Sequence, residues 1–287
     1  MTGTVRRDFR ARAAAAARAS FTLVELLVAV AVLALLLVFA AQLVSMASHT
    51  TLADSRKIDA LAQARLALDR FGLDWSAHIA RGDVDVSFVK NAGNDEIAFA
   101  TQMPSPDGTR SVALVDYRVN AVGTPGNNAY RLERGLYGYS WAGGNSFAFP
   151  LSQASYSSLL AAANYQTLAP GVFRLEVCLL VKAATNGASG YWWPAGTTVA
   201  SLTSPTNVAA VIVAVAALDD STRKLVDDTH LARLAGALAD VSGADPVATW
   251  QAALSRPQDI TNSTGVSLPV AQAVRVYERY FYVNVVP

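Results

Sequence analysis

The chain has 287 residues, of which 52% are hydrophobic, and its formal net charge is +1. Its single cysteine, Cys178, lies in an apolar run and leaves no pair for an intramolecular disulfide, so we expect a small buried side chain there. No basic run follows residue 48, which argues against a protein that binds nucleic acid.

The first 47 residues have the pattern of a basic leader and a membrane-spanning helix. Residues 1–20 contain five arginines and one aspartate, and residues 21–47 contain Glu25 as their only charged residue. A helix of the second length spans about 40 Å, more than the ~30 Å hydrocarbon core of a bilayer. By the positive-inside rule, the N-terminus stays in the cytoplasm and the chain after residue 48 is exported.

A cleaved secretory signal is the alternative for this segment. Ser45-Met46-Ala47 offers the small residues that a signal peptidase prefers. The apolar core of an ordinary secretory signal is only about 7–15 residues long, however, which is much shorter than the run in this chain. We therefore expect the apolar run to stay as an anchor.

Glu25 is the residue that separates the possible roles of this segment. A charge near the centre of a bilayer costs at least about 2.5–3.5 kcal/mol and needs a partner or a reason. One interpretation is an interfacial carboxylate that favours the helix dipole from the first turn. The other interpretation uses its neighbours. The stretch S-FTLVELLVAVAVLALLL resembles the prepilin-type signal, in which a basic leader is cut before an aromatic residue and a glutamate is fifth in the mature chain.

The resemblance implies roles for three residues. Ser20 would be the last leader residue, Phe21 the new and N-methylated amino terminus, and Glu25 the carboxylate that pairs with the amino terminus of a neighbouring subunit. Ser20 departs from the family pattern, which has glycine there, although the side chain is still small. The partners implied are a prepilin peptidase, other pilin or pseudopilin subunits, and the bacterial inner membrane.

The helical period continues beyond the membrane segment over residues 48–82. A single stripe with spacings of three and four residues contains Leu61, Ala64, Leu68, Phe71, Trp75 and Ile79. We expect this amphipathic stalk to pack on a sheet or on another subunit. We also expect it to bend or loosen near residues 46–51 and to end at Gly82.

Residues 83–287 are predicted to form one exported domain. Strands are predicted at VDVSFVK, EIAFATQM, SVALVDYRV, AYRLERGLYG, GVFRLEVCLLVK, NVAAVIVAVAALD and AVRVYERYFYVNVV. A short helix is predicted at SQASYSSLLAAANY, and a helical and loop insertion at about residues 219–269. In that insertion we expect Ser221 or Thr222 to cap a helix, and a connection rich in Gly, Pro, Ser, Thr and Asn to follow it. The segment 207–218 is too short for a second membrane span.

The order of these pieces has a wider resemblance. The segments EIAFAT, VDYRVN, YRLERGLYG, APGVFRLEV and GYWW are similar to pieces of the J-type minor pseudopilins of type II secretion. The resemblance implies an α+β, pilin-like fold, in which a long N-terminal helix packs on an antiparallel β-sheet. The long segment at 219–269 departs from that family and indicates a divergent branch, such as the pilin-like cassette proteins of Verrucomicrobia-type bacteria.

We find no pattern that predicts catalysis, a metal site or a cofactor. The three histidines, His49, His78 and His230, are scattered, and no zinc, nucleophile-elbow or phosphate-loop motif is present. Four acidic residues within 219–228 could provide carboxylate ligands for calcium, but they lack the alternating spacing of an EF-hand loop. Helix capping is the simpler explanation for them. We therefore expect no enzyme activity, no cofactor and no small-molecule substrate.

Two classes of function remain open. The first is a structural subunit, a minor pilin or pseudopilin of a type IV pilus-like or type II secretion filament, which assembles through its N-terminal helix after leader cleavage. The second is a periplasmic binding or enzymatic domain that is tethered to the membrane by a borrowed pilin-like anchor. Glu25 and its neighbours favour the first class.

Overall fold

The computed structural model divides the chain into two compact units between Leu52 and Ala53. The structure describes residues 22–79, 84–90, 93–103, 112–123, 129–139, 156, 159–181, 190–192, 199–202, 208–241 and 243–283. Each unit is considered by itself below.

The first unit contains the start of helix α1 (Leu23–Ser76). Within α1, the span Leu23–Ala47 has a mean hydropathy of 3.0 and contains no buried residue, and it is long and apolar enough to cross a membrane. The backbone is helical through residues 46–51 as well, where the sequence predicted a bend or loosening. The helix ends within the second unit, at Ser76 and not at Gly82, because Ala77 lies in a turn and His78 forms a bridge with Thr101.

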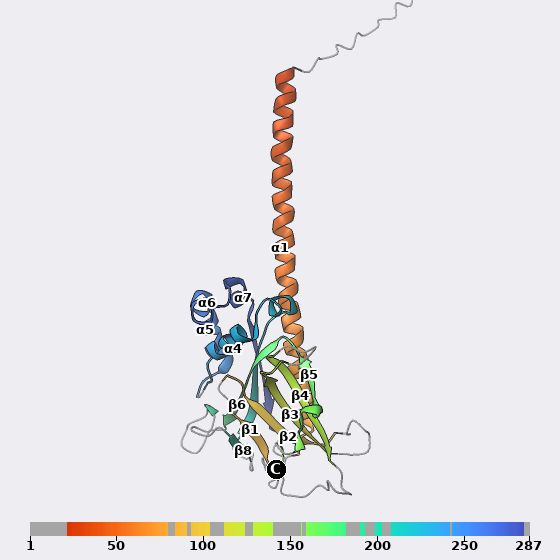
Figure 1. Ribbon diagram of the computed structural model, residues 1–287, viewed down its shortest axis with the longest axis vertical. Coiled ribbons are helices and arrows are strands. Elements are labelled where there is room, and N and C mark those ends of the chain that lie inside the picture. The colour runs from red at the N-terminus through yellow and green to blue at the C-terminus, as the bar shows by residue number, and fades with distance from the viewer. Residues whose placement is uncertain are drawn as a thin grey trace, which may run out of the picture. The chain divides into compact units, whose positions relative to one another are not determined.

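The second unit contains two antiparallel sheets (Figure 1). The six-stranded sheet has the order β5-β4-β3-β2-β1-β8. Its strands are β1 (Val86–Val89), β2 (Glu96–Thr101), β3 (Val112–Asn120), β4 (Arg131–Tyr139), β5 (Tyr165–Ala169) and β8 (Val199–Leu202). The predicted meander is confirmed, because β1 to β4 pair in sequence order.

The four-stranded sheet has the order β10-β9-β6-β7. Its strands are β6 (Val172–Val181), β7 (Gly190–Trp192), β9 (Val208–Ala217) and β10 (Arg275–Tyr282). The run VAAVIVAVAA, predicted as a fully covered strand, is the inner strand β9 and is buried on both faces. The sequence predicted a single sheet, and the structure corrects this to two.

Five short helices fill residues 220–273. They are α3 (Asp220–Arg223), α4 (Asp228–Ala237), α5 (Pro246–Leu254), α6 (Pro257–Thr264) and α7 (Leu268–Ala273). The predicted caps Ser221 and Thr222 are wrong. Asp219 caps α3, and its side chain accepts a hydrogen bond from the Thr222 amide at 3.0 Å; Asp227 caps α4 in the same way.

The short helix predicted around residues 152–165 lies partly outside the described residues. The described part contains helical positions at Tyr156 and Leu159 and a 3₁₀ turn, η1 (Ala162–Asn164). Tyr165, which ended the predicted helix, begins strand β5.

Three apolar clusters hold the second unit together. The largest cluster joins the end of α1 to the inner faces of both sheets, with Phe71 in ring contact with Phe99, Tyr117 and Phe281. The second lies between the other face of the four-stranded sheet and helices α4 to α7, around Trp250 (Figure 1). The third covers part of the outer face of the six-stranded sheet. The predicted packing of a long helix on antiparallel sheet is therefore confirmed.

The stripe by which α1 packs differs in part from the prediction. Leu68, Phe71 and Trp75 are buried as predicted, but Leu61 is 41% exposed. Alanines fill the remaining contact positions, which are Ala60, Ala64 and Ala67. Their small side chains let the helix backbone approach the sheets closely. Along α1, the alanines therefore make the first contacts with the sheets, and the aromatic side chains make the last ones.

Candidate processing and assembly site

The first turn of α1 is closed by a reciprocal pair of hydrogen bonds. The Thr22 backbone N–H donates to Glu25 Oε2 at 3.0 Å, and the Glu25 backbone N–H donates to Thr22 Oγ1 at 3.2 Å. The Thr22 hydroxyl also donates to Glu25 Oε2 at 3.0 Å. This is a capping box, in which an N-cap threonine and a glutamate three residues later satisfy amide donors that a helix start leaves free.

These hydrogen bonds involve only one of the two oxygen atoms of the Glu25 carboxylate. All of its hydrogen bonds within the described residues go to Oε2, and the side chain lies on an exposed part of the helix. Oε1 is therefore available for a donor from outside the described chain. Because α1 starts at this turn, the helix dipole also favours a negative charge at this position.

A shallow groove runs along α1 from this carboxylate. It is lined by Val24, Glu25, Val28, Ala29, Val32, Leu33 and Leu36. These residues form two rows with a spacing of four, and such rows are the ridges between which another helix packs. Among the described residues that line the groove, Glu25 alone is polar, so a helix that fills it would bring apolar side chains and one hydrogen-bond donor.

Of the three predicted site residues, the structure describes only Glu25. Ser20 and Phe21, the predicted cleavage and methylation residues, lie outside the described residues, and Glu25 lies in the first turn of the helix as expected. Sequence reasoning missed Thr22. The pattern T-L-V-E before an apolar run was a signal for its capping role.

Comparison with known proteins supports the pattern at this end of the chain. Residues 16–41 match the family described as the prokaryotic N-terminal methylation motif. The chain therefore carries this motif. The matched stretch includes Ser20, Phe21 and Glu25 and confirms the predicted signal, while it covers only a small part of the chain.

The other comparisons concern the whole chain. A search of curated proteins gave no match. Among solved structures, the type IV-like pilin TTHA1219 from Thermus thermophilus aligns with 77% of this chain and 94% of its own, at 11% sequence identity and a TM-score of 0.30.

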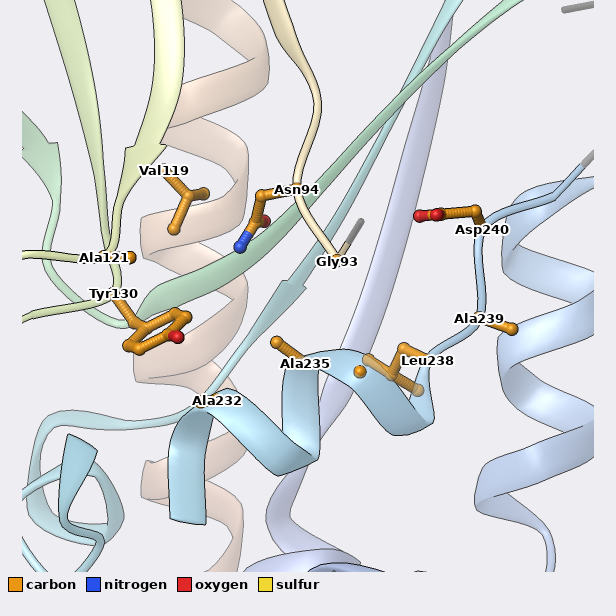
Figure 2. A pocket seen from close by; sticks show the side chains of 11 residues that line it. Gly93, Asn94, Val119, Ala121, Tyr130, Ala232, Ala235, Leu238, Ala239 and Asp240 are labelled. Carbon is orange, nitrogen blue, oxygen red and sulfur yellow. The ribbon is translucent and has the colours of Figure 1, made fainter. Parts of the chain in front are cut away.

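The second unit has a pocket of its own, shown in Figure 2. Its walls are the ends of β3 and β4, the turn at Gly93 and Asn94, and helix α4 with the connection that follows it. Tyr130 lines the pocket and has a backbone φ of 52°, the positive region that non-glycine residues rarely adopt. The Asn94 side chain is held by β6, because its Oδ1 accepts a hydrogen bond from the Leu175 N–H at 2.8 Å. Most of the side chains that line the pocket are apolar and small.

A group of carboxylates lies beside this pocket. Asp95, Glu176 and Asp240 have oxygen atoms within 4.8 Å of one another. Two cations of the chain itself, Lys90 and Arg174, pair with these acids. The acids therefore form an internal ion-pair network, and nothing in their geometry calls for a metal.

Proposed function

We propose that this protein is a minor pilin or pseudopilin, a structural subunit of a type IV pilus-like or type II secretion filament. The observation that carries the proposal is Glu25. It is a carboxylate whose Oε1 has no hydrogen bond within the described residues, at the start of an exposed apolar helix and inside a match to the N-terminal methylation motif. In an isolated anchor the capping box would use Oε2 alone, whereas assembly would also give Oε1 a hydrogen-bond donor.

In this proposal, a prepilin peptidase at the inner membrane cuts between Ser20 and Phe21 and methylates the new amine of Phe21. The subunit then stays in the membrane through one span, with its C-terminal domain on the periplasmic or extracellular side. The apolar helix moves into a filament, and Glu25 Oε1 accepts from the amine of a neighbouring subunit. The groove between Val24 and Leu36 receives a neighbouring helix.

The finer assignment is also part of the proposal. The order of strands resembles that of the J-type pseudopilins, and helices α3 to α7 add a layer that would suit a divergent branch such as the cassette proteins. A subunit with this additional layer is more plausible as a minor component, because repeated packing in a thin filament leaves little room for bulky additions.

Mass spectrometry of the N-terminal peptide from membranes of the native host tests the proposal. We expect a chain that begins with N-methylated Phe21. Ser20→Glu should block processing because it puts bulk and charge beside the scissile bond. Ser20→Gly is the matched control and should be processed at least as well as the wild type. An intact Met1, or a terminus at Ser48, would rule the proposal out.

A further inference from the structure

The pocket of Figure 2 is an open cavity with small side chains on its walls. Its volume is about 580 Å³, which lies within the ~300–1,000 Å³ typical of small-molecule sites. Helix α4 lines it with Ala232, Ala235 and Gly236, and a Cβ added at Gly236 would meet no described heavy atom within 4 Å. The same holds at Gly93, in the turn before β2. The described parts of the chain therefore leave room for a ligand.

Tyr130 presents an aromatic ring to this cavity from the residue before β4. Two hydrogen bonds hold its positive-φ backbone. The Tyr130 N–H donates to the Asn120 carbonyl at 2.6 Å, and Arg223 Nη2 donates to the Ala129 carbonyl at 2.5 Å. Such a conformation persists only where its surroundings fix it. The ring is thus a fixed wall, and an aromatic face attracts both a second ring and a cation.

Asp240 is the only charged residue among the described residues that line the cavity. Its Oδ1 lies 2.5 Å from Arg174 Nη2, and its side chain is 37% exposed. Figure 2 shows the carboxylate directed toward the turn at Gly93. Within the described part of the chain, Asp240 Oδ2 has no hydrogen-bond donor, so it can accept a hydrogen bond from a ligand.

The ion pairs beside the cavity leave the charge of Asp240 in excess. Lys90 pairs with Asp95, and Arg174 pairs with Glu176, so the buried charges cancel two by two. The exposed carboxylate of Asp240 adds one further negative charge. Burial, and then repulsion from Glu176, raises the pKa of Asp95 to about 7, so the excess is complete above that pH. The cavity therefore attracts cations and repels anions.

We propose that this cavity binds a small organic cation, which consists of an ammonium group on a compact apolar body. The ammonium group donates to Asp240 Oδ2 in a charge-assisted hydrogen bond, which fixes the orientation of the ligand. The apolar body lies on Ala235 and against the ring of Tyr130. The assignment goes beyond the proposed function, because none of the described residues that line the cavity belongs to α1.

NMR of the full-length chain in detergent micelles, with carbon-13 in the alanine methyl groups, tests the site at pH 8. The probes are phenethylammonium chloride, the neutral 2-phenylethanol and the anionic 3-phenylpropionate, which all have a phenyl ring on a short chain. Equilibrium dialysis gives the free concentration of each probe. We expect the cation to shift the Ala235 methyl signal saturably, the neutral probe to bind at least about tenfold more weakly, and the anion to cause no saturable shift.

Two variants change the charge of one acid each. Asp240→Asn keeps an acceptor for Arg174 but removes the excess charge, so it should weaken binding of the cation about tenfold and leave binding of the neutral probe nearly unchanged. Asp259→Asn is the matched control, because Asp259 is an exposed acid on α6 that does not line the cavity. Binding of the cation should be the same in this variant as in the wild type.

A third variant changes the space and keeps the charge. Gly236→Leu places a side chain at the edge of the cavity where no described atom obstructs its Cβ, and leucine favours a helix more than glycine does. It should abolish the shifts caused by the cation without lowering the melting temperature. No response of Ala235 to the cation, equal binding of the cationic and neutral probes, or wild-type affinity in Asp240→Asn would overturn the proposal.

Discussion

At the residue scale, Glu25 has two functions that a suitable pair of substitutions separates. Thr22→Val removes the cap but keeps the carboxylate, and it should cost the helix start about 1 kcal/mol. Glu25→Leu removes the charge and the bonds that Thr22 donates to the carboxylate, but it keeps the cap bond from the backbone N–H of residue 25 to Thr22 Oγ1. We expect Glu25→Leu to remain in membranes and to lose partner subunits, whereas Thr22→Val should retain most of them.

Affinity capture of the membrane-extracted protein, normalised to the amount of the chain, measures this difference. Equal capture of partners by Glu25→Leu and the wild type would contradict the counter-ion role. Equal loss in both variants would attribute the effect to the cap alone.

Glu278 gives a second prediction at this scale. Burial, and then the nearby Asp245, raises the pKa of Glu278 to about 6. Since the raised pKa belongs to the folded state, ionisation of Glu278 opposes folding, and its stabilising contribution is lost as the pH rises from about 4.5 to 6. Glu278→Gln should therefore raise the melting temperature at pH 7.5 more than at pH 4.5. A change of the same size at both pH values would show that Glu278 does not titrate in this way.

The residue scale also shows what the sequence could predict about the sites. Glu25 stood out because it was the only charge in an apolar run. Its bond to Thr22 was predictable too, since the two residues are three apart. The network at Asp95 and Glu176 was not predictable, because these residues are 81 positions apart and meet only through the pairing of two sheets with the loops between them.

At the element scale, the end of α1 packs mainly through its aromatic residues. Phe71 is buried and contacts the rings of Phe99, Tyr117 and Phe281, whereas Leu73 on the opposite side of the helix is 63% exposed. Phe71→Ala should lower the free energy of unfolding by about 3–5 kcal/mol. Leu73→Ala is the control and should change it by at most about 0.5 kcal/mol. Denaturant unfolding of a fragment from Ala53 to Pro287 measures both, and equal effects would contradict the burial of Phe71.

The sequence predicted the strands better than it predicted the short helices or the separation into two sheets. The strands were found because β-branched and aromatic residues alternate between turn signals. Helices α5 and α6 lie where the sequence predicted a connection rich in Gly, Pro, Ser, Thr and Asn. Pro246 and Pro257 occupy the first turns of these helices, where proline is well tolerated. The separation into two sheets depends on the distant pairing of β6, β9 and β10, which no local pattern reveals.

At the scale of the whole molecule, the division after Leu52 separates two kinds of surface. The span Leu23–Ala47 exposes apolar side chains on all its faces, whereas residues from Ala53 onward contain the three apolar clusters of the fold. The first surface needs lipid or other helices around it. The second unit has the core that an independently folding domain requires.

A fragment from Ala53 to Pro287 should therefore be soluble and should unfold cooperatively without any disulfide, since Cys178 is a buried free thiol. A shorter fragment from Asp83 loses Leu68, Phe71 and Trp75, whose burial contributes about 5–9 kcal/mol before entropy costs. Because these side chains cover the inner faces of both sheets, we expect the shorter fragment to aggregate. Size-exclusion chromatography and thermal unfolding of the two fragments give the comparison. A monodisperse, cooperatively folding fragment from Asp83 would show that the end of α1 is a dispensable tether, and it would favour a domain with a borrowed anchor over a filament subunit.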